Sequence, residues 1–209
     1  MNLRTRTGAL TLAVAALAGS AQVATAKTST GTQPAASFAS DCTAQTYSQA
    51  LLGFGDSNLY AAVPQGSFEG AIDGWTITGA ARQVADPAYP TGPVADTTSL
   101  ELAAGATATS PPICANANTP TFRLFLKALS ANPAVYGITV NYLDTTGGTV
   151  HGAAALTPST TWGLSPQILV KTNKIATDST GWGHIQISVT APTNSALRID
   201  DLYLDPKMR

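Results

Sequence analysis

Aromatic and polar side chains alternate with aliphatic ones in a segment near the C-terminal end of the chain. Trp182, His184 and Gln186 would share one face of a strand there, opposite Ile185 and Ile187. An aromatic ring can stack on the apolar face of a pyranose, while imidazole and amide groups hydrogen-bond to its hydroxyls. The pattern therefore indicates a face that could bind a sugar, unless loops cover it or Trp182 caps the end of the domain.

A second aromatic side chain, Phe125, lies between Arg123 and Lys127 on the outward phase of another expected strand. If both strands belong to one sheet, Arg123 and Phe125 would extend the same ligand-binding surface. The other two tryptophans indicate packing instead. Trp75 falls on an inward phase and is expected in the core, and Trp162 in the core or at its edge.

A short motif near the N-terminal end raises the question of catalysis. Residues Gly55–Ser57 resemble the Gly-Asp-Ser nucleophile block of a group of esterases. Those enzymes pair the serine with a histidine from a D-x-x-H motif, and neither His151 nor His184 stands in such a motif. The glutamates of the chain, Glu69 and Glu101, have no evident partner for glycoside hydrolysis. The sequence therefore predicts no catalytic site, and we interpret the esterase motif as accidental.

Residues 1–26 have the three parts of a secretory signal peptide. Residues 1–6 carry two arginines, an apolar run covers residues 9–18, and Ala24-Thr25-Ala26 supplies small residues before a cleavage point. The apolar run is shorter than the about 20 residues that span a bilayer, so a membrane anchor is the weaker interpretation. Residues 27–40 are rich in Thr, Ser, Gly and Ala and predict a flexible leader. We expect a secreted or cell-surface protein, with no membrane insertion after cleavage.

Charge is scarce along the chain: charged residues make up 11% of it, and the formal net charge is −1 at pH 7. The sequence has no basic segment that could attract nucleic acid or anionic lipid. Thr, Ser, Ala and Gly supply the surface instead, which suits neutral, hydroxyl-rich partners. The composition therefore argues against nucleic acid as a partner and favours a polysaccharide or a glycan of the cell envelope.

Two cysteines are present, Cys42 and Cys114. In an exported chain an even number of cysteines indicates a disulfide, with two free thiols or a metal pair as the alternatives. Closing a loop of about 70 residues would stabilise the fold by about 4 kcal/mol on the chain-entropy model. The bond would tether residues 41–66, an N-terminal extension whose elements the sequence does not define, to a domain at 67–209.

From residue 67 onward, apolar residues recur with a period of two, interrupted by Gly, Pro and Asn. The clearest strands on this pattern are expected at 75–78, 99–102, 122–127, 138–142, 149–156, 185–189 and 202–204. Strands that are half-buried on one face require two packed antiparallel sheets, so the fold class is an all-β sandwich. Alternation alone does not separate a jelly roll from an immunoglobulin-like topology.

Two motifs bracket this β region. Gly66-Ser67-Phe68-Glu69 with Gly74-Trp75 opens it, and Arg198-Ile199-Asp200-Asp201-Leu202-Tyr203-Leu204 closes it. Their order and separation resemble the galactose-binding-like jelly rolls, in particular the xylan- and glucan-binding carbohydrate modules. The whole chain also resembles a group of exported actinobacterial proteins built on the same motifs. The resemblance, over about residues 63–205, implies a jelly-roll β-sandwich with a carbohydrate ligand.

The resemblance also implies a structural calcium ion. In the family the opening Glu and the closing Asp lie on neighbouring strands, and these correspond to Glu69 and Asp200. Carboxylate and carbonyl oxygens are the ligands that such a hard cation takes. Strand phase favours Asp200 over Asp201, because Asp200 would point inward. The alternative is a carboxylate pair without an ion, hydrogen-bonded to backbone amides or to Arg198, and Gln65 replaces the Asn usual in the family.

Together these features predict an exported, non-catalytic binding module for carbohydrate. The alternative is a structural or protein-interaction domain of the cell surface that binds no sugar. The exposure of Trp182 and Phe125 distinguishes the two hypotheses, because burial of both would remove the local support for a sugar site.

Overall fold

The computed structural model describes residues 42, 45–89, 91, 95–130, 135–143 and 149–205, and only the backbone of 149–154. The expected signal peptide at 1–26 and leader at 27–40 lie outside the described residues, as does the turn between the strands at 138–142 and 149–156. Within the part that is described, no helix is long and apolar enough to cross a membrane.

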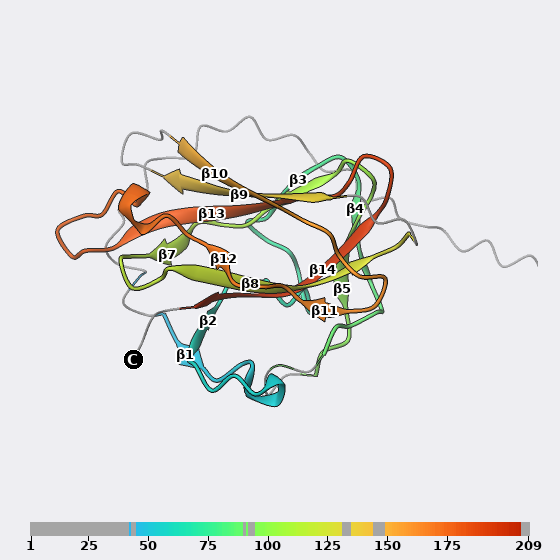
Figure 1. Ribbon diagram of the computed structural model, residues 1–209, viewed down its shortest axis with the longest axis horizontal. Helices are drawn as coiled ribbons and strands as arrows, with labels where there is room; N and C mark the ends of the chain where they lie inside the picture. Colours follow the sequence, from blue (N-terminus) through green and yellow to red (C-terminus); the bar gives the residue numbers. More distant parts are fainter. Residues whose placement is uncertain are drawn as a thin grey trace, which may run out of the picture. The chain divides into compact units, whose positions relative to one another are not determined.

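The strands form two antiparallel sheets, A and B, that lie one above the other (Figure 1). Sheet A contains β1 (Tyr47–Ser48), β2 (Tyr60–Ala62), β4 (Ala81–Val84), β5 (Ser99–Leu102), β8 (Thr121–Ala128), β11 (Gly163–Leu164), β12 (Ile168–Leu169) and β14 (Leu197–Asp205). Strand β14 is at its centre, with β8 along one side and β5 followed by β2 along the other.

Sheet B contains β3 (Thr76–Thr78), β6 (Thr107–Thr109), β7 (Ile113–Ala115), β9 (Tyr136–Leu143), β10 (Thr149–Leu156) and β13 (Gly183–Thr190). Strand β13 is at its centre, between β9 on one side and β6 and β7 on the other. The chain crosses between the sheets repeatedly, for example after β3, after β5 and after β8. The expected jelly-roll β-sandwich is thus confirmed.

The main core lies between the sheets and is built from the inward residues that the alternation predicts. Strand β8 contributes Phe122, Leu124 and Leu126, and β13 contributes Ile185, Ile187 and Val189. Each of the expected strands is present, with bounds within two residues of those read from the sequence except at β14, which begins earlier. Trp75 is buried in this core, where its Nε1 donates to the Pro64 carbonyl at 3.0 Å, as its inward phase predicts.

A second, smaller core lies on the outer face of sheet A. It joins Ala50, Leu51 and Tyr60 of the N-terminal extension to Phe125 and Tyr203, with Trp162 and Leu164 packed against it. The extension also forms a short 3-10 helix, η2 (Leu52–Phe54), and strand β2, which pairs directly with β14. Residues 45–62 are therefore an integral part of the sandwich, since they add strands to sheet A and cover part of its outer face.

Candidate functional site

The two groups of predicted ligand-binding residues lie in different sheets. Arg123 and Phe125 are on β8 in sheet A, whereas His184 and Gln186 are on β13 in sheet B, with Trp182 immediately before it. The single surface that would form if both strands shared a sheet therefore does not exist.

Phe125 points outward from sheet A as its phase predicts, but it is fully buried. Phe54, at the end of η2, covers it with a ring-centroid distance of 5.2 Å, and Tyr89 does so at 5.6 Å. These two rings contact each other edge to face at 5.4 Å and remain 45% and 42% exposed. We call Phe54 and Tyr89 the aromatic pair. The outer face of sheet A thus presents aromatic rings to solvent, but they come from the extension and a loop rather than from β8.

Arg123 is held within the fold beside this face. Its Nε donates to the Ser165 carbonyl at 3.1 Å, and its Nη1 lies 3.4 Å from the Asp56 carboxylate. Asp56 also accepts hydrogen bonds from the Tyr60 hydroxyl at 2.6 Å and the Asn58 amide at 3.0 Å. The aspartate of the Gly-Asp-Ser motif therefore helps to fix the extension on sheet A, which gives it a structural role.

On sheet B, the outward residues of β13 are engaged with their neighbours. Gln186 Nε2 donates to the Ser110 carbonyl at 3.0 Å, and the Ser188 and Thr109 hydroxyls lie 2.8 Å apart. Thr107 and Thr190 form a similar hydroxyl pair at 2.8 Å, and Asn141 donates to Ser188 at 3.0 Å. Trp182 is half-buried. The predicted polar face exists, but its side chains are largely satisfied by one another.

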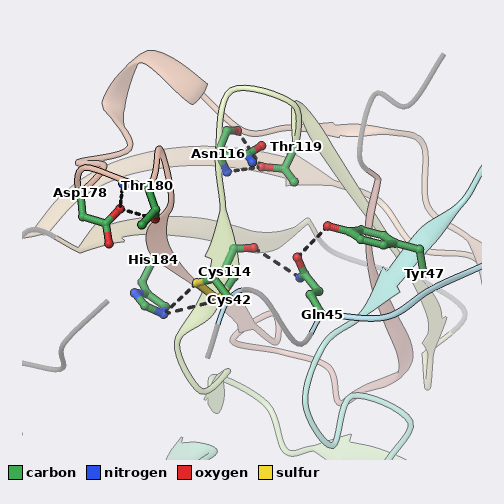
Figure 2. Close-up of a disulfide and its surroundings, with 9 residues drawn as sticks. All are labelled: Cys42, Gln45, Tyr47, Cys114, Asn116, Thr119, Asp178, Thr180 and His184. Carbon is green, nitrogen blue, oxygen red and sulfur yellow. Dashed lines mark hydrogen bonds between the residues drawn. A yellow bond between two sulfur atoms is a disulfide. The ribbon is translucent and has the colours of Figure 1, made fainter. Parts of the chain in front are cut away.

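The predicted disulfide between Cys42 and Cys114 is present, with an S–S distance of 2.07 Å. Figure 2 shows His184 pointing at this bond, and its Nε2 lies 3.7 Å from Cys42 Sγ and 3.6 Å from Cys114 Sγ. His184 is only 2% exposed. Its imidazole is thus packed against the disulfide and is not on an open ligand-binding surface, which corrects the expectation that it faces solvent.

Four carboxyl groups gather where the opening and closing motifs meet. They belong to Glu69, Asp96, Asp200 and Asp201, and we call this group the acidic corner. Glu69 accepts hydrogen bonds from the backbone amides of Thr97 and Thr98 at 2.9 and 2.7 Å, and from both threonine hydroxyls. The predicted juxtaposition of the two motifs is therefore present, and it includes two further aspartates.

A β-bulge places both aspartates of the closing motif in this corner. The pairing of β14 with β8 shifts between Asp200 and Tyr203, and Asp201 adopts a φ of 46°. Because of this irregularity Ile199 and Leu202 both point into the main core, and Asp200 and Asp201 are both buried on the other side. The strand-phase argument that put Asp200 inward and Asp201 outward is wrong, since it assumed an unbroken period of two.

Backbone and hydroxyl donors reach Asp200 and Asp201 both from the loop that follows β4 and from β14 itself. Asp200 accepts from the amides of Ala88 at 3.1 Å and of Asp201 at 2.9 Å. Asp201 accepts from the Thr91 hydroxyl at 2.7 Å and from the Tyr203 hydroxyl at 3.3 Å. The same loop carries Tyr89 of the aromatic pair, so the corner and the pair are neighbours.

The electrostatics of the corner favour a cation. Burial, followed by the charge of Asp201, raises the pKa of Asp200 to about 9. Burial, Asp201 and Glu69 raise the pKa of Asp96 to about 7, against the nearby amide of Tyr89. Both carboxyl oxygens of Asp96 are buried, and no hydrogen bond of good geometry reaches them from the described residues. The buried and poorly hydrogen-bonded carboxylate of Asp96 is a suitable ligand for Ca²⁺, and Glu69, Asp200 and Asp201 place further carboxylates near it, so these residues fit the ion that the family resemblance implies.

Comparison with known proteins gives similarity of fold only. No protein-family model and no curated protein matches the chain. A xylan-binding domain of family CBM22 from Paenibacillus barcinonensis is 15% identical with a TM-score of 0.47, over 71% of this chain and 94% of that one. A CBM61 module solved with β-1,4-galactotriose is 16% identical with a TM-score of 0.42, over 69% and 97%. A tailspike protein of bacteriophage CBA120 is 18% identical with a TM-score of 0.48, over 68% of this chain but only 21% of the tailspike.

Proposed function

We propose that the protein is a non-catalytic carbohydrate-binding module and that the aromatic pair contacts the ligand. The observation that carries the proposal is the exposure of two rings, Phe54 and Tyr89, on a buried third, Phe125. Rigid, exposed aromatic side chains match the apolar faces of pyranose rings and lose little conformational entropy on binding. Burial of Phe125 beneath both rings fixes them, so the surface is formed before any ligand arrives.

The ligand that we propose for this surface is a polysaccharide or an envelope glycan outside the cell. A disulfide forms and persists in oxidising compartments, which agrees with the Cys42–Cys114 bond. With a net charge of −1, the chain offers little attraction to polyanions. Stacking on neutral sugars does not depend on charge, so binding should be insensitive to salt.

Binding to soluble and insoluble polysaccharides and to purified cell wall tests the proposal, with wild type compared with Phe54→Ala and Tyr89→Ala. Truncating an aromatic anchor at the centre of an interface costs about 2 kcal/mol, or roughly 30-fold in affinity. The control is Leu169→Ala, which removes an apolar side chain that is 74% exposed on β12. It should bind like wild type, and every variant should still unfold in one cooperative transition above the assay temperature, so that lost binding does not reflect lost fold.

Trp182→Ala separates the two surfaces. Loss of binding in this variant alone would move the site to the half-buried Trp182 beside sheet B. Absence of binding to every glycan would contradict the proposal. Because Leu52, which is 56% exposed, adjoins Phe54, the same apolar patch would then fit a protein partner at the cell surface.

We also propose that the acidic corner binds a calcium ion. Glu69, Asp96, Asp200 and Asp201 supply the carboxylates, and the ion would neutralise their mutual repulsion. A ligand that binds only the folded state at about tenfold to hundredfold excess over its Kd stabilises it by about 1.4 to 2.7 kcal/mol. Thermal unfolding of chelator-treated protein, with and without added calcium, measures this gain. Superimposable curves from a metal-free start would refute a calcium site.

A further inference from the structure

Three potential metal ligands meet at the disulfide, far along the sequence from one another. The sulfur atoms of Cys42 and Cys114 and the imidazole nitrogen of His184 lie within 4.8 Å of one another. Cys114 on β7 and His184 on β13 are direct register partners, so two strands of sheet B fix their separation. The sheet therefore fixes two of the three ligands, and the disulfide brings Cys42 to them.

Two of the three ligands are buried, and the sheet fixes the position of His184. Cys42 and His184 are each 2% exposed, whereas Cys114 is half-buried. His184 is held by the sheet, because it is paired with Cys114 of β7 on one side and with Leu143 of β9 on the other.

We propose that reduction of the Cys42–Cys114 bond converts this group into a binding site for Zn²⁺, with His184 as the third protein ligand. Two thiolates and an imidazole are a ligand set that zinc takes in proteins, and three protein ligands leave a fourth position for water. In the oxidised protein the sulfurs are bonded to each other and cannot act as thiolates. The site is therefore gated by the redox state of the chain. This inference is independent of the carbohydrate proposal.

The reaction balances with a dithiol as reductant. The dithiol gives two electrons and two protons to the disulfide and becomes a cyclic disulfide, while Cys42 and Cys114 become thiols. Zinc binding then releases one proton from each thiol. Cys114 is half-buried and Cys42 is 2% exposed, so Cys114 is the more accessible of the two cysteines. Bound zinc would hold Cys42 against Cys114 and so keep the N-terminal segment tethered after the covalent bond is lost.

The test is a zinc titration of the full chain in competition with a chromophoric chelator. The protein is first reduced with a dithiol, then separated from it under anaerobic conditions. We expect one zinc per reduced chain, and none for the oxidised chain or for reduced chain alkylated at both cysteines. His184→Gln should weaken zinc binding by about 100-fold or more, since losing even an outer partner of a ligand costs about 10- to 100-fold. The control is His151→Gln, which removes the only other histidine of the sequence.

Two outcomes would overturn the proposal: no stoichiometric zinc on the reduced chain, or equal zinc affinity for reduced wild type and reduced His184→Gln. The oxidised variants are first compared with wild type by thermal unfolding. Cobalt substitution of reduced wild type gives an answer that needs no variant. A thiolate-to-cobalt charge-transfer band with tetrahedral d–d bands is expected, and a spectrum of octahedral aqueous cobalt would contradict the site.

Discussion

Asp96→Asn gives the sharpest test of the acidic corner, because it should change stability in opposite directions with and without calcium. The substitution keeps the shape of the side chain and removes one negative charge. In metal-free protein, the buried Asp96 carboxyl carries an unfavourable charge beside Asp201 and Glu69. In calcium-loaded protein, the same charge would bind the ion.

The magnitude follows from the raised pKa. The pKa of Asp96 is 3.8 in the unfolded chain and about 7 in the folded protein. Between these values the folded state holds the extra proton, so the free energy of unfolding falls as pH rises and then stays low. Each unit by which folding raises the pKa lowers the free energy of unfolding at high pH by about 1.4 kcal/mol. Partial exposure of Asp96 reduces this loss through solvent screening. We expect metal-free Asp96→Asn to be about 1 to 2 kcal/mol more stable than wild type at about pH 8. The two proteins should have the same free energy of unfolding at about pH 4.

Chemical denaturation with chelator and with saturating calcium measures both signs. At about a hundredfold excess of calcium over its Kd, wild type should gain about 2.7 kcal/mol and Asp96→Asn little, so the order of stability reverses. Asp73→Asn is the matched control, because Asp73 is exposed and its substitution changes the net charge by the same amount. The reasoning fails if metal-free Asp96→Asn is less stable than wild type at the higher pH, or if both proteins gain equally from calcium.

Two further substitutions test the framework around the sites. Gly183→Ala would place a Cβ 2.3 Å from the backbone oxygen of Ala176, so it should lower the free energy of unfolding by about 1 to 3 kcal/mol. A change below about 0.5 kcal/mol in denaturant melts would contradict this packing. Arg198→Ala removes the guanidinium that pairs with Glu101 at 2.6 Å and should lower the free energy of unfolding by about 2 kcal/mol in the same assay. Arg82 also pairs with Glu101, but its side chain is 71% exposed, so Arg82→Ala should lower it by less than about 1 kcal/mol.

The sandwich could be predicted from the sequence because its long strands are regular. In β13, Ile185, Ile187 and Val189 alternate with polar residues without interruption, and all three are buried in the main core. Strands β1, β2, β6, β7, β11 and β12 have at most three residues and, unlike β3 with Trp75 and Ile77, show no recognisable period of two. Such strands are defined by their pairing with a long neighbour, and a local pattern does not contain that information.

The candidate sites were harder to predict because they depend on irregular structure. The bulge at Asp201 moves two carboxylates to one side of β14, and nothing in the alternation of apolar residues announces it. Asp96 and Tyr89 lie in the loop after β4, and Phe54 ends a short 3-10 helix, so none of them belongs to a periodic segment. The period of two therefore identified the residues that strands position, and the opening motif identified Glu69, whereas Asp96, Tyr89 and Phe54 carry no such signal.

The bulge also connects the two parts of the proposed function. Asp200 accepts the amide hydrogen bond of Ala88, and Asp201 accepts that of the Thr91 hydroxyl. Tyr89 lies between these two anchors, and its ring forms half of the aromatic pair. A calcium ion that fixes both aspartates would therefore hold the loop that carries Tyr89. Because coupling between two binding equilibria is reciprocal, a glycan bound at the pair would in turn tighten calcium at the corner.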